Sequence, residues 1–441
     1  MKELYNNFLI SHIELLMDDA RTNRRNLLRL IGASASAIVA GCGDSSEDES
    51  VMSDSDKLNS TELMEPEENE RDSGSRIYYI GSDGDDENSG RQLYPLNSVS
   101  EGIDRARPGD IVWIRPGEYR ETVRTVRSGR QNAPITIIGS SDAVIRPPIG
   151  SDNCIRIGHN HIHVRGVSIN GLLNPERRFE DYRAWAKRCV LITPKDNEKV
   201  DYLRNIVVEP SLMGGCSRPM VRAIRLRNAS IGGFKMDGPA GMQFDPRVDN
   251  HEEGRIREVV YLGTPEIHRD KPFYPWDALD QSRNIRVHHI NNSEGYAHNE
   301  LVDIKLGTTD VTVEYCTDRN SEVGRNTSSV VTIGGNSNVI RWNDIADCDY
   351  GLRFGAWTPS GDIDGDDWAQ NNSVYGNRIT EYDTEPILFW NNPEWDLGPS
   401  SSDVQKTICN NQIEGNKREF SFAQQSCKND LPEGNGVGHT N

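Results

Sequence analysis

The two residues best suited to chemistry are Asp303 and Lys305, which stand two positions apart in the stretch E-L-V-D-I-K-L, residues 300–306. Side chains two apart in a β-strand point to the same face, so we expect this carboxylate and this amine side by side on a solvent-facing surface. A neutral lysine can serve as a general base. A carboxylate beside it favours the protonated form instead. The pair therefore offers either an acid–base site or a surface ion pair, which contributes about 0–1 kcal/mol.

Further polar residues stand on both sides of this pair in the sequence. His298 is suited to acid–base work because imidazole titrates near neutral pH, and a structural hydrogen bond at a corner is the alternative. Asp362, Asp364 and Asp366 stand in the loop SGDIDGDDW, and oxygen-rich loops suit Ca²⁺. The loop lacks the sixth-position glycine and the final glutamate of an EF-hand, so a solvated acidic loop is the alternative to a calcium site.

The elements that must position these residues form a degenerate repeat. From residue 135 onward, a short apolar strand, a Gly/Asn/Asp turn and a second short strand recur about every 20–30 residues, which is the spacing of a solenoid. Clear copies are Asn284–Asn291, Leu301–Cys316 and Val330–Ile345. Alternation within the second copy predicts that Val302 and Ile304 face the core.

Asparagines recur at the corners of this repeat. Asn292, Asn343 and Asn377 each follow a short strand. Asparagine accepts the left-handed backbone that tight corners need, and its side chain can bond to neighbouring backbone groups. We expect these three residues to stack as a ladder with a structural role.

The chain from residue 77 onward has a recognisable order of elements. The pattern predicts strands over Ile77–Ile80, Ile111–Arg115 and Ala133–Ile138, with an amphipathic helix over Val99–Ala106 between the first two. A helix at this point can cover the open end of a stacked sheet, whose free edge would otherwise invite aggregation. We therefore expect an N-terminal capping helix.

Three segments between residues 78 and 139 carry a family resemblance: YYIGSDG, YPLNSVSEGIDRARPGDIVWIRPGEY and NAPITIIG. They resemble the N-terminal cap and first coils of pectin-lyase-like proteins related to polysaccharide lyase families nine and six, the pectate lyase and the alginate lyase and chondroitinase types. The resemblance covers residues 77–170 well and the later coils loosely. It implies an all-β fold, a single-stranded right-handed parallel β-helix over residues 77–441.

The same resemblance implies a reaction. Lyases of these families cleave acidic polysaccharides by β-elimination, in which a base removes the proton α to a uronic carboxylate and a cation neutralises that carboxylate. Residues 300–305 resemble the segment in which a glutamate precedes the catalytic lysine by five residues, which implies Lys305 as the base. Arg353, in a segment that lacks the family's histidine, or Ca²⁺ would be the neutralising group. The family's arginine stands one coil after the lysine, whereas Arg353 stands two coils on, about 10 Å away.

The resemblance also implies supporting residues. Asp303, Glu300 and His298 would assist at the reacting centre, and Tyr296 and Trp357 would stack on sugar rings, with core packing as the alternative for both aromatic residues. The predicted function is thus an extracellular polysaccharide-active protein, a lyase for uronate-containing polysaccharide. The alternative is a non-catalytic surface glycan-binding or cell-envelope protein. In both cases the expected partner is an acidic polysaccharide or a cell-surface glycan.

Composition excludes some partners. The formal net charge of −19 argues against nucleic acid and against an anionic membrane surface. Only 11 of the 49 basic residues are lysine, a bias that resembles the proteins of extreme halophiles, with an ordinary acidic secreted protein as the alternative. The hydrophobic fraction of 35% with 39 glycines indicates a turn-rich protein with a modest core, and we expect a monomer.

The N-terminus is typical of a targeting segment. Arg24 and Arg25 precede a short apolar run that ends V-A-G-C at Cys42, which resembles a Tat-type lipoprotein signal over residues 1–42, with a buried helix as the alternative. We expect lipidation of Cys42, and Tat export to the cell surface or outside the cell, with the lipid as the sole membrane contact. Residues 43–76 are acidic and nearly free of apolar side chains, which predicts a disordered linker.

Export would permit disulfides. Cys316 and Cys348 occupy similar places in adjacent repeats, which predicts one bond. Cys409 and Cys427 are the next predicted pair, followed by Cys189 and its later neighbour in the sequence, Cys216. None of the cysteine spacings matches a zinc site.

Overall fold

The computed structural model describes the regular part of the unit Asp54–Asn441. The described residues are 75–174, 184–195, 200–241, 257–264, 272, 274–276, 278–296, 298–319, 329–355, 369–389 and 405–414. A separate unit, Met1–Ser53, lies outside them, and so do the expected signal segment, its Cys42, and all but two residues of the expected linker. Among the described residues, no helix is long and apolar enough to cross a membrane.

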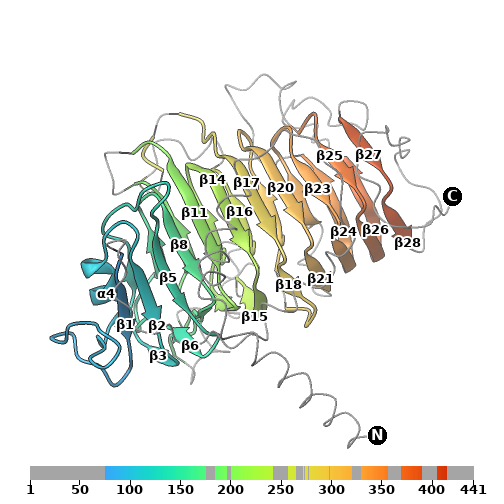
Figure 1. Ribbon diagram of the computed structural model, residues 1–441. Helices are drawn as coiled ribbons and strands as arrows, with labels where there is room; N and C mark the ends of the chain where they lie inside the picture. The colour runs from blue at the N-terminus through green and yellow to red at the C-terminus, as the bar shows by residue number, and fades with distance from the viewer. Residues whose placement is uncertain are drawn as a thin grey trace, which may run out of the picture. The chain divides into compact units, whose positions relative to one another are not determined.

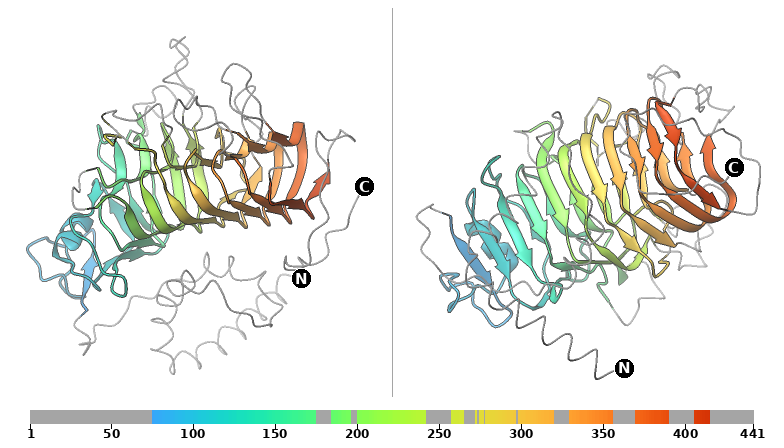
Figure 2. Two further views of the ribbon diagram at one scale, coloured as in Figure 1. Left: turned by 90° about the horizontal axis from the view of Figure 1, so that it is seen from above. Right: turned by 45° about the vertical axis from the view of Figure 1, so that its right-hand side comes forward.

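The described strands wind into a right-handed parallel β-helix, which confirms the expected all-β solenoid (Figures 1 and 2). Each complete coil adds one strand to each of three parallel ladders. The first ladder is an 11-stranded sheet. Its strands, in order, are β1 (Ile77–Ile80), β2 (Ile111–Ile114), β5 (Ile135–Gly139), β8 (Ile162–Arg165), β11 (Leu203–Glu209), β14 (Leu226–Gly232), β17 (Arg283–His288), β20 (Thr309–Glu314), β23 (Val339–Arg341), β25 (Ser373–Tyr375) and β27 (Thr407–Cys409).

The second and third ladders join into one 17-stranded sheet because β24 (Asp344–Phe354) and β26 (Arg378–Phe389) run through both. The other strands of the second ladder are β3 (Gly117–Tyr119), β6 (Ala143–Ile145), β9 (Ser168–Ile169), β12 (Leu212–Cys216), β15 (Lys235–Ala240), β18 (Asn291–Asn292), β21 (Thr317–Arg319) and β28 (Gln412–Glu414). The other strands of the third ladder are β4 (Val123–Arg124), β7 (Asn153–Ile157), β10 (Arg188–Ile192), β13 (Val221–Ala223), β16 (Val260–Leu262), β19 (Val302–Ile304) and β22 (Ser329–Ile333).

Inward-facing apolar side chains fill the space between the ladders. On the third ladder the register aligns Val221, Val260, Val302 and Val331, and all four are buried. Ile304 is also buried, as predicted. Burial of one such side chain contributes about 1.5–3 kcal/mol. Stacked columns of this kind hold successive coils together, so the apolar alternation in the sequence is the direct cause of the fold.

An asparagine ladder closes the corner between the first and second ladders. Asn343 donates to Asn377 Oδ1 at 2.9 Å, and Asn377 donates to Asn411 Oδ1 at 2.9 Å. Asn292 lies elsewhere, because the register aligns it with Asp318, to which it donates at 2.7 Å. The predicted ladder is thus right for two of its three members and wrong for Asn292.

The corner that leads into the first ladder uses polar residues with positive φ. The column comprises His161, Asn205, Asn228, Asn284, Asp310, Ser337 and Asn371, with φ between 54° and 58°. Asn and Asp adopt this left-handed region more readily than other residues that carry a Cβ. Neighbouring members also bond to one another, as in the 2.9 Å bond from Asn284 Nδ2 to Asn228 Oδ1.

The corner that leads out of the first ladder has the same backbone but different residues. Successive coils place Gly233, His289, Tyr315, Trp342 and Gly376 there, with φ between 50° and 66°. This backbone costs about 1–2 kcal/mol for a residue with a Cβ. The three rings stack with centroids 5.1 Å apart in both pairs, and each pair contributes about 0.5–1.5 kcal/mol. We call these three residues the aromatic corner; stacking offsets only part of its strain.

Helix α4 covers Val99–Arg105, within one residue of the predicted Val99–Ala106. Ser98 begins it by accepting a hydrogen bond at its Oγ from the backbone N–H of Glu101 at 3.2 Å. Ile103 packs into the same core as the strands, so the helix is anchored to the first coils. Its role as a cap stays a prediction.

The predicted bond between Cys316 and Cys348 is wrong, because both are buried free thiols. The register gives the reason. Thr317 pairs with Asp344, which stacks Cys316 over Asn343 and leaves Cys348 farther along β24. Similar position in the sequence repeat did not mean the same position in the coil.

The other cysteine predictions have mixed outcomes. Cys189 and Cys216 are buried and free, so the third predicted pair is also not formed. Cys409 is disulfide-bonded. Its predicted partner, Cys427, lies outside the described residues.

Candidate functional site

The candidate site lies on the outward row of the third ladder. The register aligns Tyr261 with Asp303, Asp303 with Thr332 and Thr332 with Arg353. Arg353 is therefore two strands from Asp303, as the sequence predicted. Consecutive strands of one stack thus bring together side chains that are up to 92 residues apart in the chain.

Asp303 and Lys305 are both largely buried, which corrects their predicted exposure. Asp303 is 1% exposed, and the side chain of Lys305 is 12% exposed. Strand alternation predicted the correct side of the strand for this pair, but it did not predict the neighbouring side chains that bury the pair. The ammonium of Lys305 lies 4.8 Å from the ring centroid of Tyr261 on the preceding coil, and Glu258 of that coil lies beside Asp303.

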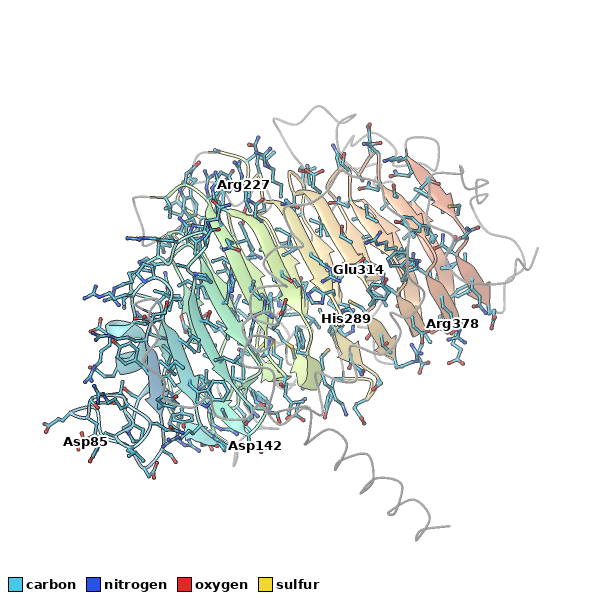
Figure 3. The ribbon with its side chains drawn as sticks, in the orientation of Figure 1. Asp85, Asp142, Arg227, His289, Glu314 and Arg378 are labelled. Carbon is cyan, nitrogen blue, oxygen red and sulfur yellow. The ribbon has the colours of Figure 1, made fainter. Side chains whose placement is uncertain are left out.

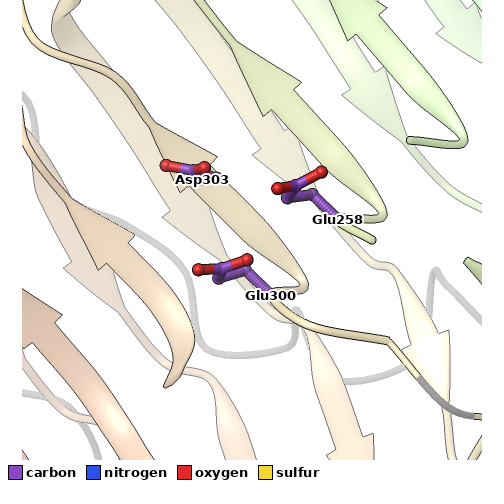
Figure 4. Close-up of side chains that lie close together, drawn as sticks. All are labelled: Glu258, Glu300 and Asp303. Atoms are coloured by element: carbon purple, nitrogen blue, oxygen red, sulfur yellow. The ribbon is translucent and has the colours of Figure 1, made fainter. Parts of the chain in front are cut away.

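Three buried carboxylates form the centre of the site (Figure 4). Val260 pairs with Val302, so Glu258 stacks directly on Glu300 of the next coil. One ligand oxygen from each of Glu258, Glu300 and Asp303 lies within 4.8 Å of the others. Like charges directly opposite one another in a sheet are destabilising. This sequence therefore tolerates an unfavourable contact at one place in an otherwise regular stack.

Two cations accompany these carboxylates. Lys305 Nζ lies 2.6 Å from Asp303 Oδ2. Arg353 Nη2 lies 3.2 Å from Glu300 Oε1 and donates to Thr332 Oγ1 at 3.0 Å. Glu300 thus links the coil of Lys305 to the coil of Arg353, and the two predicted functional cations belong to one network.

The titration behaviour follows from burial and charge. Burial, together with the negative charges of Asp303 and Glu258, raises the pKa of Glu300 to about 8. Burial and Asp303 also raise the pKa of Glu258. Burial disfavours the charged form of Lys305, but the attraction of Asp303, Tyr261 and the two glutamates outweighs it and raises the lysine pKa. At neutral pH both Glu300 and Lys305 are therefore protonated, whereas an isolated glutamate would be ionised.

The donor set fits a divalent cation. Three carboxylates face two basic groups, so the fully ionised cluster carries an excess negative charge. Asp303 Oδ1 has no hydrogen-bond partner among the described residues, although it is fully buried. Hard oxygen ligands are the ones that Ca²⁺ takes. This cluster is the calcium candidate among the described residues, and the loop with Asp362, Asp364 and Asp366 lies outside them.

His298 forms a separate buried contact. Its Nε2 lies 2.9 Å from Asp318 Oδ1, and both side chains are fully buried. Asp318 also accepts a hydrogen bond from Asn292. This is the structural corner bond that the sequence left open as the alternative to acid–base work.

The remaining predicted residues divide into two groups. Tyr296 is partly buried and packs against the hydrophobic core, which is the alternative that the sequence allowed for it. Four others lie outside the described residues: Trp357, Asp362, Asp364 and Asp366.

Sequence reasoning missed Glu258 and Tyr261. A signal was present, because E-V-V-Y-L, residues 258–262, aligns with E-L-V-D-I, residues 300–304, in the pattern of apolar positions. Alignment of these two repeats predicts that the two glutamates stack. The two segments are 42 residues apart in the chain, more than the period of about 20–30 residues, which hid their alignment.

Comparison with known proteins supports the architecture. No family model matches the chain, and no curated protein matches its sequence. An alginate lyase from Paenibacillus sp. is 15% identical with a TM-score of 0.52, and the match covers 78% of this chain and 98% of that one. A pectate lyase is 13% identical with a TM-score of 0.43, covering 74% and 81%. A lacto-N-biosidase from Eubacterium ramulus is 13% identical with a TM-score of 0.38, covering 77% and 68%. At 15% identity, the first match supports the β-helix fold and no more.

Proposed function

We propose that this protein is an extracellular polysaccharide lyase that cleaves a uronate-containing polysaccharide by β-elimination at the cluster around Lys305. One observation carries the proposal: a lysine, an arginine and three carboxylates lie together on the outward row of the third ladder. The fold is shared with an alginate lyase. Fold alone does not give chemistry, so the argument depends on the cluster.

Each residue has a distinct part in this reaction. Lys305, as the neutral amine, removes the proton α to the uronic carboxylate. The C–O bond at the β-carbon breaks as the C=C bond forms, and the leaving oxygen takes a proton from water or from the lysine ammonium just formed. Arg353 supplies positive charge on the same row and keeps Glu300 in place through their 3.2 Å contact. Tyr261 holds the lysine ammonium over its ring at 4.8 Å, which orients the amine.

Glu258, Glu300 and Asp303 would hold a calcium ion. When bound, Ca²⁺ supplies the positive charge that makes the α-proton of a uronate acidic. Without a cation, Asp303 pairs with Lys305 and favours its protonated form. Carboxylates that are engaged elsewhere attract the lysine less, so its amine loses its proton more readily.

A second candidate function is a non-catalytic glycan-binding or cell-envelope protein. The observation in its favour is the same 2.6 Å ion pair, because Asp303 raises the pKa of Lys305 and a protonated lysine is no base. Catalysis as a function of added Ca²⁺ separates the two candidates.

The test is the ultraviolet absorbance of the unsaturated product on a panel of uronate polymers, measured with and without Ca²⁺. We expect wild-type activity on at least one polymer, and Lys305→Ala to lower the rate by about 10²–10⁴-fold. Lys235→Ala is the matched control, because Lys235 also pairs with a carboxylate, that of Glu294 at 2.9 Å, but on the second ladder. Absence of signal on every polymer and metal, with folding intact by circular dichroism, would sink the lyase proposal.

We further propose that the protein is exported through the Tat system and anchored by lipid at Cys42. The support is the sequence pattern of residues 1–42. Mass spectrometry of the mature N-terminus tests it. A mature chain that begins elsewhere, without lipid on Cys42, contradicts the anchor.

A further inference from the structure

A cluster of arginines around a buried glutamate lies on the outward face of the first ladder, near the middle of the sheet in Figure 3. Glu314 is 3% exposed and accepts from Arg286 Nε at 2.6 Å and from Arg341 Nε at 2.7 Å. The side chain of Arg286 is 44% exposed, and among the described residues its terminal nitrogens donate no hydrogen bond. Glu314 thus holds a guanidinium in a fixed orientation with donors facing solvent.

A second cluster, around a carboxylate that is 39% exposed, lies on the second ladder. Asp344 pairs with Arg319 and, at 3.0 Å, with Nη1 of Arg378. The exposed fractions of these two arginine side chains are 30% and 44%. The two clusters together hold four guanidinium groups against two carboxylates. These six side chains have two more positive than negative charges, in a chain whose net charge is −19.

The aromatic corner joins the two clusters. Tyr315 follows Glu314 in the chain, and Trp342 stands between Arg341 and Asp344, one residue from the first and two from the second. Tyr315 is 38% exposed, although it is a large apolar side chain. Glycine occupies the same corner in the coils on both sides, at Gly233 and Gly376, so the fold accepts a residue without strain there. His289, Tyr315 and Trp342 occupy a strained backbone position that glycine could occupy without strain. This indicates that their side chains have a function.

We propose that the aromatic corner and its two arginine clusters bind an acidic polysaccharide chain that runs along the stack of coils. Fixed guanidinium forks recognise carboxylates, and the exposed edge of Tyr315 provides apolar contact area for the C–H groups of sugars. The ring centroids are 5.1 Å apart over three successive coils, so the rings form a row that follows the stack of coils.

The ring faces of the aromatic corner are occupied, so a ligand can reach only ring edges and the neighbouring arginines. His289 stacks on Tyr315, and Tyr315 stacks on Trp342, so the middle ring has both faces covered. Single-stranded nucleic acids bind by stacking bases on open aromatic faces. Arg341 also lies over the ring of Trp342, 4.1 Å from its centroid.

This surface is separate from the Lys305 cluster, which belongs to the third ladder. The inference rests on the proposed function for its ligand class, because both surfaces would take the same acidic polysaccharide. Here the role is retention of a long chain and not its cleavage. Binding and cleavage can therefore fail independently.

The experiment measures binding of uronate oligosaccharides by calorimetry in a Lys305→Ala background, which prevents cleavage during titration. We expect the double variant Arg286→Gln/Arg378→Gln to raise the dissociation constant by about tenfold or more. Tyr315→Gly should raise the dissociation constant as well. This variant should keep the fold, because glycine adopts φ of 54° without strain.

Two matched controls accompany these variants. Asn284→Gly makes the same change of side chain to glycine at φ 54° on the opposite corner of the first ladder, and should leave the dissociation constant unchanged. Arg120→Gln removes an exposed arginine that pairs with Glu118 at 2.7 Å on another part of the surface, and should also have no effect.

Three outcomes overturn the proposal. They are a dissociation constant that the Arg286/Arg378 and Tyr315 variants leave unchanged, absence of binding to any uronate oligosaccharide, and equal binding of an oligothymidylate. Cleavage by the wild type in any of these cases shows that the lyase proposal stands while this one falls. Binding that the variants weaken, without cleavage by the wild type, sinks the lyase proposal alone.

Discussion

The Lys305 cluster and the arginine clusters beside the aromatic corner use the same residue types in opposite proportions. On the third ladder, three buried carboxylates face two cations. On the first ladder, the single carboxylate of Glu314 is held by two arginines. The Lys305 cluster has more carboxylates than cations, so it favours a bound cation. The Glu314 cluster has more cations than carboxylates, so it favours an anionic ligand.

The carboxyl pKa values express this difference. The pKa of Glu300 is raised to about 8 by burial and by neighbouring carboxylates. The pKa of Glu209, on the first ladder, falls to about 2, because bonds and charges from His288 and Arg165 outweigh the opposing effect of burial. The same stacked β-strands carry both a raised and a lowered carboxyl pKa. The neighbouring side chains along a row, and not the fold, therefore decide the electrostatic character of a site.

The largest expected effect comes from breaking the buried pair on the third ladder. Above about pH 8, where Glu300 is ionised, Arg353→Met leaves a buried carboxylate without its guanidinium and should cost about 3–5 kcal/mol of unfolding free energy. Arg120→Met, at an exposed pair, should cost about 0–1 kcal/mol. Denaturant unfolding measures both. Equal costs for the two variants would contradict the account of a buried, poorly compensated cluster.

The next effect is a pH dependence of opposite sign in the two regions. Glu300 has a folded pKa above its unfolded value, so its contribution to stability is greatest below pH 4.5 and is lost as pH rises through about 8. Glu209 has a depressed pKa, so its contribution of about 3 kcal/mol is present above pH 4.5 and is lost as pH falls through about 2.

Unfolding midpoints across pH, compared for wild type, Glu300→Gln and Glu209→Gln, measure these dependences. Glu300→Gln should flatten the curve between about pH 4.5 and 8, and Glu209→Gln should flatten it below pH 4.5. A Glu300→Gln curve parallel to that of the wild type would count against the raised pKa.

Calcium should stabilise the Lys305 cluster on the third ladder and not the arginine clusters. At about 100 times its dissociation constant, Ca²⁺ should add about 2.7 kcal/mol to the unfolding free energy. Glu258→Gln with Glu300→Gln should remove this gain, because both are in the candidate ligand set. Arg286→Gln should keep it. Thermal unfolding with Ca²⁺ and with chelator measures the difference, and a gain that survives the double variant would rule out this site.

The smallest effect concerns the aromatic corner. Tyr315→Gly relieves about 1–2 kcal/mol of left-handed backbone strain but loses two stacking contacts of about 0.5–1.5 kcal/mol each. The net change in unfolding free energy should stay within about 1 kcal/mol. A loss of several kcal/mol by denaturant unfolding would show that the ladder is mainly structural.

Much of the fold was predictable because it depends on local pattern. The strand over Ile77–Ile80 was predicted to the residue, and the helix from Val99 to within one residue. Burial of Val302 and Ile304 followed from alternation alone. These features depend on neighbours within a few residues in the chain, which a sequence displays directly.

The candidate site was predictable only in part. The sequence indicated Asp303, Lys305 and the two-coil distance to Arg353, because these depend on strand alternation and on counting repeats. It missed Glu258, which joins the cluster only through the register across 42 residues. The predicted disulfide of Cys316 failed for the same reason, since a shift within one repeat changes every neighbour on the next coil.

The amino-acid sequence by itself determined a parallel solenoid and placed Lys305 and Asp303 on its outward side, because period-two alternation and corner residues act locally. Only the tertiary structure decided that this outward pair is buried and that Glu258 stacks on Glu300. It also decided that His289, Tyr315 and Trp342 form one column. Inter-coil register makes these contacts, and register depends on the lengths of the connections between strands, which the local pattern does not encode.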